Sequence, residues 1–193
     1  MLSRQLVKEA LRRALATGAD YAEVFAEHTL NKNINLISGK TDKIADAVIS
    51  GVGIRIFKGT RCVSGSASSL APEAVLSCAS KVADALTGTA AVEDILLRER
   101  LFGDIHPVKI VPADVRNAEK IEYVREACLA AKEYGDEISQ VSGSYLEVDH
   151  QIMIATSEGL LTHDRQIRNR IVVTSIASRD GENQDGSVNH GAR

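Results

Sequence analysis

A glycine-rich stretch at residues 50–69 has the composition of a phosphate-binding loop. It reads SGVGIRIFKGTRCVSGSASS and carries the basic residues Lys58 and Arg61. A dinucleotide-binding loop needs a third glycine three residues after the second, followed by the N-terminus of a helix. Ile56 stands at that position, within an Ile-Arg-Ile-Phe pattern that is typical of a strand. The stretch therefore predicts a β-hairpin and not a phosphate site.

A second phosphate-like motif fails on its spacing. A Walker loop needs a glycine five residues before the glycine of its Gly-Lys-Ser/Thr. The Gly-Lys-Thr of residues 39–41 has Ile34 at that place. Within the predicted hairpin, Gly51 and Gly53 are expected to allow a close backbone approach or a β-bulge.

Histidine and cysteine, which can bind zinc, are present without a metal-binding spacing. No two histidines are four residues apart, the spacing with which one helix face offers two ligands; they are His28, His106, His150, His163 and His190. The cysteines form no Cys-x-x-Cys pair and predict reduced thiols in a cytoplasmic protein; they are Cys62, Cys78 and Cys128. Unless the fold assembles a site from distant histidines, we expect no catalytic, cofactor-binding or metal-binding residue in this chain.

Small residues alternate along residues 64–69, Ser-Gly-Ser-Ala-Ser-Ser. The segment has no Gly-x-Ser-x-Gly motif, so it does not predict a nucleophilic serine. Small side chains on a strand instead indicate a face that another backbone approaches closely. That backbone belongs to a helix, to a partner chain, or to an extended peptide added along the sheet edge.

The overall composition is that of an ordinary globular protein. The 193 residues are 44% hydrophobic and 25% charged, with a formal net charge of -3. This charge gives no reason to expect a nucleic-acid or anionic-membrane partner, because both need concentrated positive charge. The first helix is basic and amphipathic, but its small apolar face favours packing in a core over lying on a membrane.

The elements that position these residues are helices and strands in separate blocks. Helices are predicted over residues 2–15, with Ser3 as the cap, and over residues 71–86 and 113–135. The third of these is expected to bury Ile121, Val124, Cys128, Leu129 and Ala131, and to end at Gly135. Residues 87–115 predict an irregular connection across the surface.

Alternating segments predict the strands. Residues 20–30 form one strand, residues 31–33 a turn, residues 34–38 a return strand, and residues 43–57 pair with residues 61–69. From residue 138 onward the pattern is strands again, with turns at 157–159 and 163–164, and the polar end is a hairpin tip or a link. Short turns between consecutive strands require antiparallel pairing. The predicted fold class is α+β: an antiparallel sheet with about three helices packed on one side, in a single domain over residues 1–193.

Several segments resemble, in order, the N-terminal region of the TldD/PmbA (TldD/TldE) family. They are GADYAEVFAE, GVGIRIFKG, GSASSLAPEAV and TSEGLLTHDRQIRNRIVVTSIASRDGENQDG. The specificity lies in the ordered set, which covers essentially the whole chain. The TldD branch is favoured, although GSASS also resembles the PmbA side.

The resemblance implies a zinc metallopeptidase, a hydrolase that degrades or processes peptides, and an older family label, modulator of DNA gyrase. It also implies a PmbA/TldE-like or self subunit as partner, hence an oligomer, and a zinc site of the form His-Glu-x-x-x-His in the C-terminal half. This sequence has no His-Glu dipeptide, so no family catalytic residue is carried onto it. The chain resembles the N-terminal domain alone, without the metallopeptidase half, and is expected to be inactive alone.

Two functions therefore stay open at this point. The first is a scaffold and partner-contact domain of a TldD-like peptidase. The alternative is a stand-alone, non-catalytic binding or adaptor domain with the same fold. An open reading frame after Arg193 that contains His-Glu-x-x-x-His would decide for the first.

Overall fold

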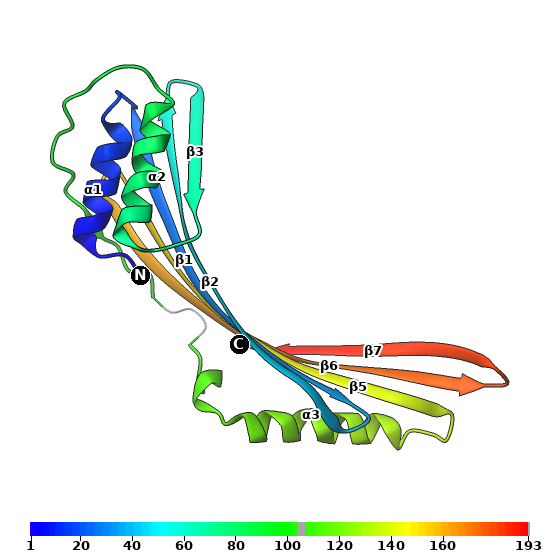
Figure 1. Ribbon diagram of the computed structural model, residues 1–193. Coiled ribbons are helices and arrows are strands. Elements are labelled where there is room, and N and C mark those ends of the chain that lie inside the picture. The colour runs from blue at the N-terminus through cyan, green and yellow to red at the C-terminus, as the bar shows by residue number, and fades with distance from the viewer. Residues whose placement is uncertain (104–106, 193) are drawn as a thin grey trace. The chain divides into compact units, whose positions relative to one another are not determined.

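The computed structural model describes residues 1–103 and 107–192, which form three α-helices and seven strands (Figure 1). The helices are α1 (Arg4–Leu15), α2 (Pro72–Asp84) and α3 (Asn117–Lys132), and a short 3-10 turn, η1, covers Pro112–Asp114. The strands are β1 (Tyr21–Ile37), β2 (Lys40–Lys58), β3 (Arg61–Ala67), β4 (Arg98–Glu99), β5 (Ile138–Thr156), β6 (Leu160–Arg179) and β7 (Glu182–Ala192). The predicted α+β class is confirmed.

The strands of the described chain form one sheet in the order β3-β2-β1-β5-β6-β4, and β7 also pairs with β6. The predicted hairpin at residues 50–69 is confirmed, because β2 and β3 pair antiparallel from Val52 opposite Ala67 to Lys58 opposite Arg61. Strand β4 is the parallel exception, with Arg98 opposite Leu160. Its two residues lie inside the segment predicted to be irregular, which is otherwise mostly without regular structure.

The chain divides into two compact units. Unit 1 consists of residues 1–29, 49–103 and 150–165, and unit 2 of residues 30–48, 107–149 and 166–192. Strands β1, β2, β5 and β6 contribute residues to both units. Each unit has its own hydrophobic core.

In unit 1, α1 and α2 cover one face of the sheet (Figure 1). Ser3 caps α1 as predicted, because its side chain accepts a hydrogen bond from the Leu6 amide. The strand residues that face the helices alternate along each strand, and the core they form with the helices is aliphatic: Ala22, Val24, Ala26, Val52, Ile54, Ile56, Val75, Ala79, Val82, Met153 and Ala155 are among its members. Burial of these side chains is the main stabilising term of unit 1.

In unit 2, α3 packs on the sheet over a smaller core: Ile34, Leu36, Val124, Cys128, Val141 and Tyr145. The predicted core positions Val124 and Cys128 are confirmed, but Leu129 is 50% exposed. Leu129 follows Cys128 by one residue and therefore points about 100° away from it around the helix. Helix α3 ends at Lys132, three residues before the predicted Gly135.

The turn predicted at residues 31–33 is wrong, because β1 continues through it to Ile37. Lys32 makes an ion pair with Asp46 of β2 at 2.8 Å, and Ile34 is fully buried, so these residues belong to the paired strand. The chain reverses instead at Ser38 and Gly39, which both have a positive φ, 48° and 76°. Two left-handed residues in succession are typical of the two-residue hairpin turn.

The turn predicted at residues 163–164 is also wrong, because β6 is continuous from Leu160 to Arg179. The reversal lies at Asp180 and Gly181, with φ of 53° and 86°. The polar end of the chain is then strand β7, which pairs antiparallel with β6 from Arg179 opposite Glu182 onward. Of the two interpretations of this end, the hairpin is confirmed.

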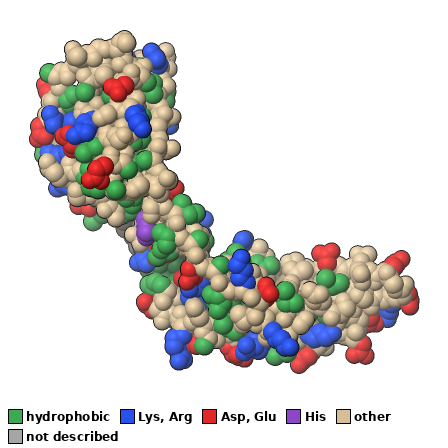
Figure 2. All heavy atoms as spheres, viewed as in Figure 1, with side chains coloured by type: hydrophobic (Ala, Val, Ile, Leu, Met, Phe, Trp, Pro, Cys, Tyr) green, Lys and Arg blue, Asp and Glu red, His purple; other side chains and the backbone are tan. Residues whose placement is uncertain are grey.

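No helix within the described residues is long and apolar enough to cross a membrane. On the face seen in Figure 2, acidic and basic side chains are interspersed with hydrophobic ones in both units.

Candidate functional site

The face of the unit 1 sheet that points away from α1 and α2 carries aromatic side chains, whereas the described core beneath the helices is aliphatic. The chain has four tyrosines and three phenylalanines. Tyr21, Phe25 and Phe57 lie on this face, which we call the aromatic face, and each is half-buried. Because aromatic and arginine side chains are enriched in protein–protein interfaces, this composition is typical of a contact surface.

Neighbouring strands position these side chains. The rings of Tyr21 on β1 and Phe57 on β2 have their centroids 5.9 Å apart in a tilted arrangement. The guanidinium of Arg55 lies 5.4 Å from the Phe57 ring centroid and donates to Glu23 Oε1 at 2.6 Å. Burial, and then the nearby Glu23 carboxylate, raise the pKa of Tyr21. The cluster is therefore held in place by contacts within this chain.

A hollow of about 350 Å³ lies beside this cluster, with Phe25 on its wall. Four small residues contribute to its lining, Gly53, Ser64, Gly65 and Ser66, together with Glu23, Ile54 and Arg55. A Cβ added to Gly53 would meet nothing within 4 Å. The close approach or bulge predicted at Gly53 is wrong, because Gly53 pairs regularly with Ser66. At Gly51 a close approach is confirmed, since a Cβ there would lie 3.1 Å from the Ala67 carbonyl oxygen.

Strand β3 is the edge strand beside this hollow, and its two faces differ. On one face, a Cβ added to Gly65 would lie 2.7 Å from Val82 Cγ2 of α2. The alternative that small residues admit a helix is therefore confirmed for this face. On the other face, Ser64 and Ser66 are exposed.

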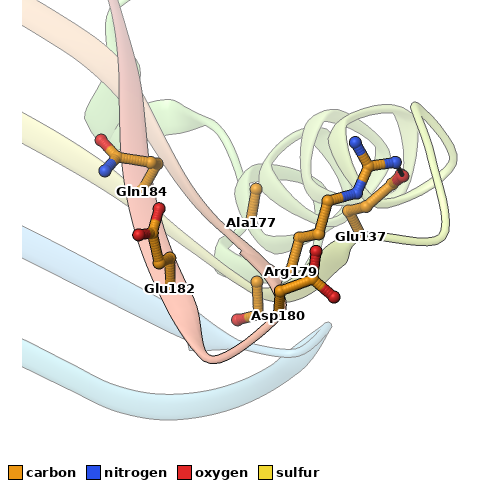
Figure 3. A pocket seen from close by; sticks show the side chains of 7 residues that line it. Glu137, Ala177, Arg179, Asp180, Glu182 and Gln184 are labelled. Carbon is orange, nitrogen blue, oxygen red and sulfur yellow. Dashed lines mark hydrogen bonds and ion pairs between the residues drawn. The ribbon is translucent and has the colours of Figure 1, made fainter.

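A second hollow, of about 480 Å³, lies in unit 2 at the tip of the β6–β7 hairpin (Figure 3). Arg179 donates to Glu137 Oε1 at 2.5 Å, and the Ser178 amide donates to the Glu137 carbonyl oxygen at 2.8 Å. The Ser178 hydroxyl donates to Asn183 Oδ1 at 2.6 Å. Asp180 and Glu182 complete a polar rim whose charged side chains are exposed. This arrangement closes the hairpin and offers no nucleophile–base pair.

The histidines are dispersed through the described chain. His28 Nδ1 is hydrogen-bonded to Ser50 Oγ at 2.7 Å, and His163 Nε2 lies 3.6 Å from Glu99 Oε1. His150 Nε2 lies 3.4 Å from Glu27 Oε2 without hydrogen-bond geometry. His190 is exposed on β7, and His106 lies outside the described residues. Among residues 1–103 and 107–192, no group of three or more His, Cys, Asp or Glu side chains is placed to hold a metal ion.

The cysteines are free thiols in two different environments. Cys62 is exposed on β3, whereas Cys78 and Cys128 are buried against the sheet. Burial raises the pKa of the Cys78 thiol and that of the Cys128 thiol, because the thiolate loses its hydration.

Unit 2 contains a buried charged cluster that sequence reasoning did not find. The inward face of β5 carries Tyr145, Glu147 and Asp149, which are 7%, 7% and 6% exposed. Lys120 of α3 is 2% exposed, and its Nζ lies 2.5 Å from Glu147 Oε2. The alternation of residues 145–149 was visible in the sequence, but it does not say which face is inward.

The comparisons with known proteins agree with this α+β architecture. The model of the PmbA/TldA metallopeptidase domain 1 matches residues 22–86, and that of the PmbA/TldA metallopeptidase central domain matches residues 110–193. A search of curated proteins finds no match. The chain belongs to the PmbA/TldD family, a metallopeptidase family, and corresponds to its N-terminal part.

Solved structures show the same fold at low sequence identity. A candidate modulator of DNA gyrase from Bacteroides thetaiotaomicron is 17% identical with a TM-score of 0.76, over 99% of this chain and 46% of that one. A candidate modulator of DNA gyrase from Thermotoga maritima is 18% identical with a TM-score of 0.65, over 90% and 39%. TldE from Thermococcus kodakarensis is 11% identical with a TM-score of 0.64, over 96% and 42%. The chain thus spans less than half the length of each.

Proposed function

We propose that this chain is the N-terminal, non-catalytic part of a TldD-like zinc metallopeptidase and provides a scaffold and a partner-contact surface. The observation that carries the proposal is the ordered match to the first and central domains of the family. Among the described residues, no group of side chains is placed to hold a metal ion. We infer a single α+β domain over residues 1–193, and the four strands that contribute residues to both units support this inference.

The described residues of this chain do not fit zinc. A zinc site needs three or four nitrogen, sulfur or oxygen ligands at about 2.0–2.3 Å. The described histidines and cysteines are dispersed, and no group of three metal-binding side chains is present among them. Zinc and peptide hydrolysis are therefore assigned to the C-terminal half of a longer, cytoplasmic protein, and this chain performs no step of the hydrolysis.

The aromatic face is assigned to the partner subunit, a PmbA/TldE-type protein. Its hollow has an aromatic wall, a small-residue floor and the Arg55–Glu23 ion pair at 2.6 Å. A side chain of the partner that enters this hollow would be buried against Phe25, which is how a central anchor contributes most of its binding energy. The TldE neighbour of similar fold supports this type of partner.

The hollow at Gly53 allows a sharp test. Gly53→Leu fills the hollow from a position where an added Cβ meets nothing within 4 Å, so the fold is retained. Gly186→Leu is the matched control, because Gly186 also lies in a strand with nothing within 4 Å of an added Cβ. Binding to a purified full-length PmbA/TldE-type protein is measured by titration calorimetry.

We expect Gly53→Leu to weaken binding about tenfold or more, equivalent to at least about 1.4 kcal/mol, and Gly186→Leu to leave it unchanged. Equal affinities for the two variants would exclude the aromatic face as the contact. Tight self-association that Gly53→Leu abolishes, without any binding to the PmbA/TldE-type protein, would instead assign the face to a second copy.

A further inference from the structure

We propose that the buried Lys120–Glu147 ion pair is a latch that fixes α3 to the sheet of unit 2, so that α3 is released as a unit when either charge is removed. The proposal concerns unit 2 alone and does not depend on the partner-contact function.

The latch joins one helix to one strand. Lys120 lies in α3, is 2% exposed, and places its Nζ 2.5 Å from Glu147 Oε2 on β5. The same Nζ lies 5.4 Å from the centroid of the Tyr145 ring, two residues earlier on β5. Asp149, two residues later, is buried on the same face. The ammonium of Lys120 therefore pairs with the Glu147 carboxylate and faces the Tyr145 ring.

A positive charge at this place is costly unless it is paired. Lys120 belongs to the N-terminal end of α3, where the helix macrodipole already disfavours a cation. Burial adds the loss of its hydration, and an apolar residue of similar volume would commonly stabilise such a site as well or better. Removing only one partner leaves an uncompensated buried charge. The attachment of α3 through this pair therefore requires both Lys120 and Glu147, because loss of either one leaves the other charge buried without a partner.

Apolar side chains also attach α3 along its length, because Val124 and Cys128 belong to the core of unit 2, and Ile121 and Ala131 pack against it. Val124 and Cys128 pack over Gly143 of β5, where an added Cβ would lie 2.6 Å from Val124 Cγ1 and 2.4 Å from Cys128 Sγ. The N-cap residue, Arg116, makes no side-chain capping hydrogen bond. Tyr123 and Leu129, which lie between and beside these contacts, are 56% and 50% exposed. Lys120 is thus the buried charged side chain of α3, and its ion pair joins the first turns of the helix to β5.

Hydrogen exchange followed by mass spectrometry tests the latch in the full chain. Lys120→Met and Glu147→Gln are each expected to speed amide exchange in α3 about tenfold or more, because local opening sets the exchange rate there. Exchange in α2, which belongs to unit 1, is expected to stay unchanged. The double variant Lys120→Met/Glu147→Leu, which removes both charges, is expected to restore slow exchange in α3.

Lys81→Met and Glu126→Gln serve as controls, because both residues are exposed on helices. Neither is expected to change exchange in α3. Unchanged exchange in α3 for both single variants would overturn the proposal, as would a double variant whose α3 exchanges as fast as in the single variants. Equal acceleration in α2 and α3 would also overturn it, because that result indicates global destabilisation and not release of one helix.

Discussion

The packing of α3 on β5 in unit 2 can be tested most directly at Gly143. In Gly143→Ala, the new methyl group would lie 2.4 Å from Cys128 Sγ and 2.6 Å from Val124 Cγ1. Carbon contacts are optimal at about 3.5–4.0 Å, so α3 or the strand has to move by about 1 Å. Overpacking of this kind costs about 1–3 kcal/mol, and alanine's lower chain entropy offsets about 0.4–1 kcal/mol of it.

Calorimetric unfolding measures the difference. The net cost is then at most about 2.6 kcal/mol, and at about 2–4 °C per kcal/mol for a chain of this size Gly143→Ala is expected to lower the Tm by up to about 10 °C. Gly53→Ala is the matched control, since nothing lies within 4 Å of an added Cβ there, and it is expected to raise the Tm slightly. A Tm for Gly143→Ala at or above that of the parent chain would refute the close packing of α3 on β5.

Three further expectations follow from the same contacts. With Ellman's reagent, Cys62 reacts first because it is exposed, whereas Cys78 and Cys128 react only on unfolding; three equally fast thiols would contradict the described burial. Burial, and then Glu147, raise the pKa of Tyr145 to about 12, whereas the ordinary pKa of a tyrosine is about 10. The contribution of the neutral Tyr145 to the free energy of unfolding is therefore complete below about pH 10 and is lost as the pH rises through 12. Ultraviolet titration should show a tyrosine that titrates near pH 12 and is absent in Tyr145→Phe, and a complete titration of all tyrosines near pH 10 would refute this. Gly53→Val is expected to leave the free energy of unfolding unchanged or to raise it, and a clear loss in urea denaturation would show that the hollow is closed.

Much of the fold could be predicted from local sequence. Ser3 and the spacing of the apolar residues predict helix α1. Gly59, whose φ is +56°, marks the turn of the β2–β3 hairpin. The turn at residues 31–33 was predicted wrongly because asparagine favours turns, whereas pairing and the burial of Ile34 keep the segment in β1. Strand β4 has two residues, which is too short for any periodicity to indicate it.

The candidate sites could be predicted less well, because each depends on which face of a strand is buried. Tyr21 and Phe57 are the kind of residue expected in a core, yet they lie on the aromatic face. Glu147 looks like a surface residue, yet it is 7% exposed, because the buried Val141 and Met153 fix the parity of β5. Lys120 carries no signal in a single sequence, since an isolated lysine in a helix is usually solvated.

The central claim is that this chain is a non-catalytic part of a metallopeptidase, and its metal content tests that claim most directly. The chain is incubated with zinc, dialysed and measured by elemental analysis, and its hydrolysis of an unfolded peptide is followed with and without a chelator. We predict well below one zinc per chain and no chelator-sensitive hydrolysis. One zinc per chain, with hydrolysis that is lost on chelation and in His150→Ala or His163→Ala, would contradict the account.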